Sequence, residues 1–301
     1  MEKPEPKRES GIVEVRGGDE SDKTETLEHF ESKFSEQEVK KLEREKTKEE
    51  LELLEQINKK IKEFVERYGG AYLEIRPENI HILDYSHLKQ FTCLGHYDPA
   101  KQEIILAVSS GVSRLQMANL FVHEIMHFQS FQSVIFENLE GNIKHRRVGV
   151  DVGIYDDKKM IDSLFRDLNE AITEELVKRF DWDFFESIEY TKEDAEKRNS
   201  IIKSKGYEEI AFYESKQSKD GQWEVNLGTR HYERERKYLK NIVDTIFDQN
   251  SDKFENKEQV FELFARAAMN GDLKPITALI EQTLGSGSFK RIGQETRYEK
   301  S

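Results

Sequence analysis

Two histidines that stand four positions apart in an apolar segment constrain the fold of this chain most. They lie in FVHEIMHFQS, residues 121–130, and the spacing of the surrounding apolar residues predicts a helix over 112–135. The apolar side of this helix would carry Leu115, Ala118, Val122, Ile125 and Met126. Residues four apart share one face of a helix, so His123 and His127 point the same way. Because the helix is rich in apolar residues elsewhere, we expect it to lie at the centre of the fold.

This pair of histidines has the spacing of a zinc site. Two imidazoles one helical turn apart can hold one zinc ion at about 2.0–2.1 Å. Glu124 points away from the two ligands and can reach a water at the open side of the metal, where zinc lowers the pKa of the water and the carboxylate takes its proton. The alternative is an amphipathic helix with two histidines on its polar face. Chance alone would place HExxH about 0.03 times in a sequence with these His and Glu frequencies.

A third ligand is expected in LNEAITEEL, residues 168–176, within a helix predicted over 158–180. Glu170 and Glu174 are also one turn apart, on a helix whose other positions are apolar. One carboxylate can bind the metal, and the other can accept a hydrogen bond from the free N–H of a liganding histidine. The alternative is an exposed pair of glutamates on an acidic helix. The nearby HExxH motif favours the ligand interpretation.

The two motifs together, HEIMH and NEAITE, resemble those of the gluzincin zinc peptidases, the thermolysin-like clan. The resemblance covers the two motif helices and the preceding β-rich stretch, about a third of the chain. It implies that His123, His127 and Glu170 bind zinc, that Glu124 is the catalytic base, and that Glu174 orients a histidine. Asn169 matches the residue before the glutamate ligand. The connection between the motifs is longer than in thermolysin itself and contains VGVDVGIY (148–155), predicted as one half-buried strand.

The resemblance also implies two elements around the metal. One is an edge strand upstream of the HExxH helix that pairs with a peptide substrate, for which QEIILAV (102–108) is the candidate. The other is a Tyr or His donor for the oxyanion from the C-terminal half. TRHYERER (229–236) offers His231 and Tyr232, of which Tyr232 is our candidate. The alternative interpretation of Tyr232 is an ordinary aromatic residue that packs into the helical subdomain.

Other metal and catalytic sites have weaker support. Ser130 and Ser133 stand where a metzincin needs Gly and a third His. Cys93, upstream of the HExxH helix, resembles the arrangement in deformylases, but the Gly-rich motif of those enzymes is missing, so we interpret it as a core residue. The remaining upstream histidines lack ligand spacing and are interpreted as structural: His81, His87 and His96.

Composition excludes several classes of function. The 301 residues carry a net charge of −13, which disfavours a nucleic-acid-binding face and an anionic membrane surface. The basic run KHRR (144–147) is interpreted as a solvated turn. A single cysteine excludes an internal disulfide framework, and MEKPEPKRES lacks the apolar core of a signal peptide. We therefore expect a cytoplasmic protein.

The predicted fold class is α+β and gluzincin-like. A disordered charged tail (1–34) and a charged amphipathic helix (35–69) precede a zinc-binding subdomain (70–180) with a small twisted mixed sheet and a mostly helical subdomain (181–301). The strands are expected in the following segments: 71–75, 79–84, 91–97, 102–108, 148–155 and 221–228. C-terminal helices are predicted at 230–248, 256–270 and 273–284.

Two functions follow from these observations. The first is a zinc-dependent peptidase with one zinc ion per chain, Glu124 as general base and a peptide or protein substrate. The second is a non-catalytic protein that holds its subdomains together with zinc and binds a protein partner through the N-terminal helix. The substrate, the choice between endo- and exopeptidase action and the oligomeric state are not encoded in these motifs.

Overall fold

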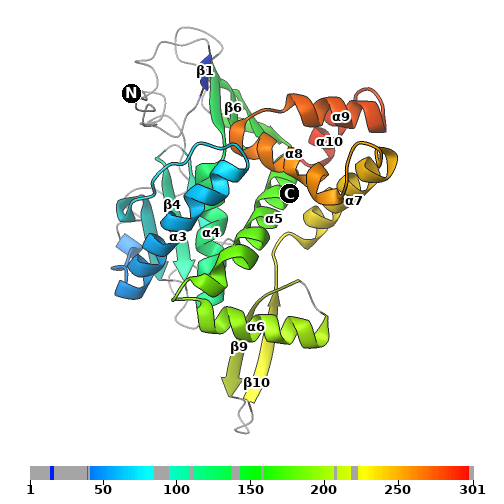
Figure 1. Cartoon of the computed structure of the whole chain (residues 1–301). Helices are drawn as coiled ribbons and strands as arrows, with labels where there is room; N and C mark the ends of the chain where they lie inside the picture. Colours follow the sequence, from blue (N-terminus) through cyan, green and yellow to red (C-terminus); the bar gives the residue numbers. More distant parts are fainter. Residues whose placement is uncertain are drawn as a thin grey trace, which may run out of the picture.

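A computed structural model of the chain describes residues 14–16, 39, 41–84, 95–99, 101–108, 112–136, 143–156, 159–206, 209–217 and 223–297. Two long helices, α4 (Arg114–Gln129) and α5 (Arg166–Phe184), lie side by side at the centre (Figure 1). Each carries one of the two predicted motifs. The other elements surround this pair and fix its position.

Helix α4 forms where the sequence predicts it. Ser113 caps its first turn, because its hydroxyl accepts the backbone N–H of Gln116 at 3.2 Å. Every residue from 121 to 129 is buried, which confirms the central position. The helix ends earlier than predicted, because Ser130 is extended (φ −63°, ψ 153°) and the chain enters strand β5 (Gln132–Phe136).

A three-stranded sheet of β2 (Ile80–Asp84), β3 (Gly95–Asp98) and β4 (Glu103–Val108) lies beside α4. The predicted antiparallel pairing of β3 and β4 is confirmed over the described residues. Strand β4 also pairs in parallel with β2, so the order is β2-β4-β3. The prediction that QEIILAV offers an open edge to a peptide is therefore wrong, because both of its edges are hydrogen-bonded within the sheet. The predicted strand over 71–75 is also absent, since these residues form neither a strand nor a helix among the described elements.

A second sheet has five strands, four of which follow α4 in the chain. It joins β1 (Glu14–Arg16), β5, β6 (Ile143–Val148), β7 (Asp151–Asp156) and β8 (Lys159–Leu164) in the order β1-β5-β6-β7-β8. The prediction of one strand over 148–155 is wrong. Gly149 has a left-handed φ of 60°, so the chain turns there and separates β6 from β7.

The residues of KHRR lie within β6, which corrects the prediction of a solvated turn. The Arg147 side chain donates to the carbonyl oxygens of Gly149 (2.7 Å), Ala267 (2.8 Å) and Gly271 (2.8 Å). It thereby joins the β6–β7 turn to the end of helix α8 (Lys257–Asn270) and to Gly271 just beyond it. A local sequence pattern could not reveal Ala267 and Gly271 as partners, because both are more than a hundred residues away from Arg147.

The C-terminal part is helical apart from one hairpin. Helix α5 begins at Arg166, later than predicted, because β8 occupies 159–164 and Phe165 is left-handed (φ 64°). Helix α6 (Lys192–Lys205) is followed by β9 (Ile210–Gln217) and β10 (Trp223–Thr229), which extend away from the body in Figure 1. The remaining helices are α7 (Glu233–Gln249), α8, α9 (Lys274–Leu284) and α10 (Ser288–Glu295). The predicted helices α7, α8 and α9 and strand β10 are confirmed, whereas β9, α6 and α10 were not predicted.

The predicted N-terminal helix is shorter than 35–69. Helix α3 (Lys48–Arg67) begins after Thr47, which forms a capping box with Glu50. Val39, Lys41 and Leu42 are also helical, but the non-helical residues 43–47 separate them from α3. The predicted amphipathic character is confirmed, because Ile57, Ile61 and Phe64 on one face of α3 are fully buried. Of the tail predicted as disordered (1–34), the structure describes only Glu14–Arg16, which differ from that prediction by forming β1. The rest lies outside the described residues.

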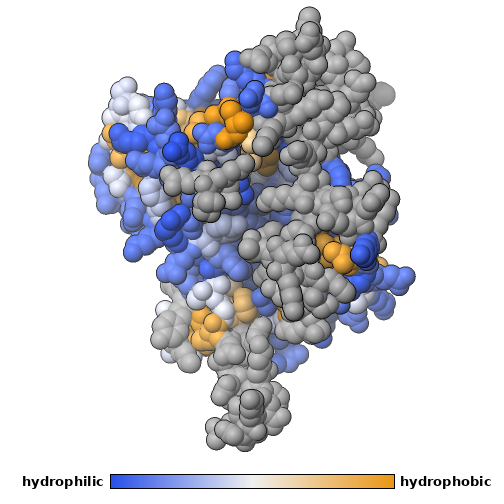
Figure 2. Space-filling model, turned by 180° about the vertical axis from the view of Figure 1, so that it is seen from behind, coloured by the Kyte–Doolittle hydropathy of each residue, from blue (hydrophilic) through white to orange (hydrophobic). Residues whose placement is uncertain are grey.

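One hydrophobic core connects these parts. It runs from Leu53 of α3 through α4, α5 and α7 to Ile292 of α10, and so crosses the predicted boundary at residue 180. The α+β class is confirmed. The described surface in Figure 2 is mainly hydrophilic, with small separate hydrophobic patches. Among the described helices, none is long and apolar enough to cross a membrane.

Candidate metal centre

The structure brings together the three side chains predicted as metal ligands. The Nε2 atoms of His123 and His127 lie 3.2 Å apart. The Glu170 Oε2 atom lies 3.3 Å from each of them. Helix α4 supplies the two histidines from successive turns, and α5 presents the carboxylate from the facing side. Within the described part of the chain, these three residues form the one group of His, Cys, Asp and Glu side chains with such proximity.

These distances fit a zinc ion. Two atoms that bind one zinc ion at about 2.0–2.1 Å with a tetrahedral angle lie about 3.3–3.4 Å apart. The three observed separations, 3.2, 3.3 and 3.3 Å, match this value without any movement of the backbone. The donor set of two imidazoles and one carboxylate is also one that zinc prefers.

Glu174 occupies the predicted place beside a ligand. The Nδ1–H of His123 donates to Glu174 Oε2 at 3.0 Å, and both side chains are buried. Burial alone lowers the pKa of His123, but the hydrogen bonds with Glu170 and Glu174 outweigh burial and hold that pKa well above its usual value. This hydrogen bond favours the tautomer in which the unprotonated Nε2 faces His127 and Glu170.

Burial would raise the pKa of Glu170 as well, yet this pKa lies well below its usual value. The charge of His127 and the hydrogen bonds with both histidines cause the decrease. Glu170 is therefore a carboxylate across the ordinary pH range, which a metal ligand must be.

Glu124 lies on the side of α4 that faces strand β3. Glu124 is 5% exposed, and burial raises the pKa of its carboxyl group above the usual value. The backbone N–H of Tyr97 on β3 donates to it. A Cβ atom at Gly95 would overlap Glu124 Oε1 and lie 3.0 Å from Glu124 Cδ, so a residue without a side chain makes room for this carboxylate. Sequence reasoning missed Gly95, because its contact lies on another element.

Tyr232 also reaches the metal centre, although it comes from the segment between β10 and α7. Its ring is stacked on that of His123, with ring centroids 5.6 Å apart and an angle of 12° between the planes. Its hydroxyl donates to Glu170. Burial and the negative charges of Glu170 and Glu124 raise the pKa of Tyr232 far above its usual value. Tyr232 is nevertheless 39% exposed, so its ring covers His123 from the solvent side. His231, the other candidate from this segment, is also exposed.

Asn169, the residue before the candidate ligand in NEAITE, stabilises a turn between two strands, which the motif did not indicate. Its Oδ1 accepts the backbone N–H of Val150 at 2.9 Å, and a Cβ atom at Gly149 would overlap it. The residue before the candidate ligand thus holds the β6–β7 turn against α5. Asp151, next in that turn, accepts a hydrogen bond from Ser163, and burial raises its pKa to about 6.

The other predicted residues play no part in the centre as described. His81 lies between Glu43 and Glu103, at 3.1 and 3.6 Å. His96 is on β3 and outside the three-residue group. Cys93 and His87 lie outside the described residues, and so does the first half of the predicted strand 91–97.

Comparison with known proteins adds no relative: no protein-family model matches the chain, and no curated protein or solved structure matches it. The resemblance to gluzincins therefore depends on the two motifs and their geometry, and it stays a prediction.

Proposed function

We propose that this chain is a zinc-dependent peptidase of gluzincin-like design. The observation that supports the proposal best is the triangle of His123 Nε2, His127 Nε2 and Glu170 Oε2, with sides of 3.2–3.3 Å. The bound zinc ion would polarise the carbonyl of the substrate and lower the pKa of a water molecule. A peptide or protein substrate is implied by the resemblance, and the proposed cytoplasmic location rests on composition.

The chain's own residues would divide the remaining chemistry. Glu124 would accept a proton from the attacking water and pass it to the leaving amine, and its raised pKa suits a group that must both take and give a proton. Tyr232 keeps its proton because its pKa is raised, so it is a hydrogen-bond donor for developing negative charge. Glu174 would hold His123 in the liganding tautomer.

The alternative, a structural zinc site without catalysis, has less support. Closed structural sites use four protein ligands, whereas the group in the described part of the chain has three. The partner-binding helix of that alternative corresponds to α3, whose apolar stripe is already buried in the chain's own core. A partner of α3 would have to bind its charged face.

Metal analysis combined with two substitutions tests the proposal. The purified chain should contain about one zinc ion and should hydrolyse peptides, and a chelator should abolish this hydrolysis. Glu124→Gln should keep the zinc and lose hydrolysis, while Glu170→Ala should lose the zinc. If Glu124→Gln retains both zinc and hydrolysis, Glu124 is not the base. If the wild-type chain retains zinc and cleaves no peptide in a broad library, the structural alternative is favoured.

A further inference from the structure

Tyr232 has a backbone conformation that neighbouring residues must hold in place. Its φ of 56° and ψ of 40° are left-handed, a conformation that is strained for a residue other than glycine. Only three non-glycine residues in the described part of the chain have a positive φ, and Tyr232 is the one at the metal centre. To keep the Tyr232 ring stacked on His123 in this strained conformation, the chain must be held in place both before and after residue 232.

The first anchor is Arg230, two residues before Tyr232. Its guanidinium donates from Nη2 to Asp181 Oδ2 and from Nη1 to Asn119 Oδ1, the latter at 3.3 Å. Asp181 lies two helical turns beyond Glu174 on α5, and Asn119 lies one turn before His123 on α4. Arg230 therefore bonds to both helices that carry the metal centre, on the faces that meet each other.

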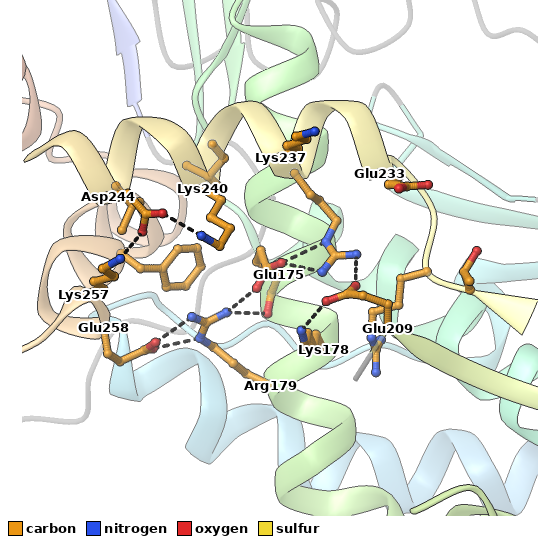
Figure 3. Close-up of a pocket in the computed structure, with 16 residues that line it drawn as sticks. Glu175, Lys178, Arg179, Glu209, Glu233, Lys237, Lys240, Asp244, Lys257 and Glu258 are labelled. Carbon is orange, nitrogen blue, oxygen red and sulfur yellow. Dashed lines mark hydrogen bonds and ion pairs between the residues drawn. The ribbon is translucent and has the colours of Figure 1, made fainter. Parts of the chain in front are cut away.

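The second anchor is Arg236, one turn into α7. Its backbone N–H donates to the carbonyl oxygen of Tyr232 at 2.8 Å. Its side chain donates to Glu175 Oε1 at 2.6 and 2.8 Å and to Glu209 Oε2 at 2.6 Å. Figure 3 labels the two acceptors, Glu175 and Glu209. Arg236, Glu175 and Glu209 line a cavity of about 470 Å³. None of the candidate metal ligands is part of its lining. Glu175 follows Glu174 on α5. The second anchor therefore also fixes the position of Tyr232 relative to α5, the helix that carries Glu170.

We propose that Arg230 and Arg236 are positioning residues that hold Tyr232 over the metal centre by tying the chain on both sides of it to α5. The inference deepens the proposed function, on which the catalytic part of its test depends. Neither arginine hydrogen-bonds to a candidate ligand, so each acts on the reaction through Tyr232.

The two anchors differ in burial, and this guides the choice of variants. The side chains of Arg230 and Asp181 are 1% and 0% exposed, and the fully buried Arg198 also donates to Asp181. Arg230→Met would therefore leave a neutral buried pair of Asp181 and Arg198, whereas removal of Asp181 would leave two buried cations. The Arg236 bonds are more open, because the Glu209 side chain is 52% exposed. Arg234 is the matched control, since it lies between the anchors and its side chain is 84% exposed.

The position of the Tyr232 ring can be measured without a substrate. The full chain labelled with 3-fluorotyrosine has 11 fluorine signals, and Tyr232→Phe identifies the one from residue 232. In Arg230→Met and Arg236→Gln this signal should shift or broaden, because the ring leaves the face of the His123 imidazole. In Arg234→Gln it should stay unchanged. With a cleaved peptide, kcat of Arg230→Met should fall about tenfold or more towards that of Tyr232→Phe at constant zinc content, and the double variant should be no slower than Tyr232→Phe.

Each outcome decides one point. An unchanged Tyr232 signal in folded Arg230→Met and Arg236→Gln overturns the proposal. If Arg230→Met does not fold, Arg230→Lys and Arg236→Gln decide in the same way, because lysine keeps the charge and cannot bond to Asp181 and Asn119 in the same geometry. A shifted signal in a chain that hydrolyses no peptide supports the positioning of Tyr232 and refutes only the peptidase function.

Discussion

Replacement of Gly95 by alanine tests the assignment of Glu124 without any change in the glutamate itself. A Cβ atom at residue 95 would overlap Glu124 Oε1 and lie 2.9 Å from Leu120 Cδ1 and 3.0 Å from Glu124 Cδ, where ordinary contact begins at 3.4 Å. Strand β3 cannot retreat easily, because Gly95 is paired with Leu106 of β4. The carboxylate therefore has to move by about 0.5–1 Å, and a displacement of 1 Å at a reacting group can reduce the rate about 10²-fold.

A 10²-fold loss corresponds to about 2.7 kcal/mol in the activation free energy. The expected cost in folding is about 1–3 kcal/mol, typical of an added methyl group in a packed site. Gly95 does not contact His123, His127 or Glu170 among its nearest atoms, so zinc content should stay at the wild-type level. The assay is kcat/KM on a cleaved fluorogenic peptide, with zinc measured on the same samples and Glu124→Gln as reference. A folded Gly95→Ala chain with wild-type zinc and wild-type kcat/KM would refute the placement of Glu124 as the base.

Three further substitutions test other parts of the structure. Glu174→Gln should weaken zinc binding about 10–100-fold in competition with a chelator, because His123 loses the partner that fixes its tautomer, whereas Glu175→Gln, which faces Arg236 instead, should leave zinc affinity unchanged. Ile57→Ala, at a fully buried position of α3, should lower the free energy of unfolding in urea by about 2–5 kcal/mol, and Lys59→Ala, at an exposed one, should change it little. Burial alone would raise the pKa of Glu209, but the hydrogen bonds from Arg236 and Lys178 lower it to about 2. Because this folded pKa lies below the unfolded value, the stabilisation by Glu209 is complete above about pH 4.5 and is lost as the pH falls towards 2. Glu209→Gln should therefore be less stable than the wild type near neutral pH, and most of this difference should be lost as the pH falls to 2. An equal difference at both pH values would contradict the assignment.

The sequence predicts those features of the candidate metal centre that depend only on the geometry of a single helix. His123 and His127, and likewise Glu170 and Glu174, are separated by one turn, so their common face follows from the helical period. The approach of α4 to α5 does not follow from this period. It was predicted from the need for a third ligand, and the 3.3 Å separations confirm that Glu170 reaches both histidines.

The parts that sequence does not predict depend on partners far along the chain. Sequence reasoning missed the turn at Gly149 because apolar residues continue to alternate with small or polar ones through it. The position requires glycine because a Cβ atom there would overlap Asn169, a residue of α5. The central position of β4 was missed because its second neighbour, β2, pairs in parallel through a separate segment. The start of α5 was displaced because Phe165 is left-handed, which no local pattern indicates. In each case, contacts with residues far along the chain decide the structure, and the local sequence pattern does not reveal them.

The charges at the metal centre argue for a cation as its natural complement. Glu124 and Glu174 are buried with His123 and His127, and Glu170 lies against both imidazoles. A buried carboxylate is costly unless a positive charge compensates it, and two neutral imidazoles supply none. Without metal, a proton on His123 provides part of this compensation, which is why its pKa is raised by Glu170 and Glu174. A divalent cation provides more charge at the same place and leaves Nε2 of both histidines as ligands. The same three carboxylates that make the metal-free centre costly would therefore favour the binding of a divalent cation, and Glu124 is the carboxylate that we propose as the base.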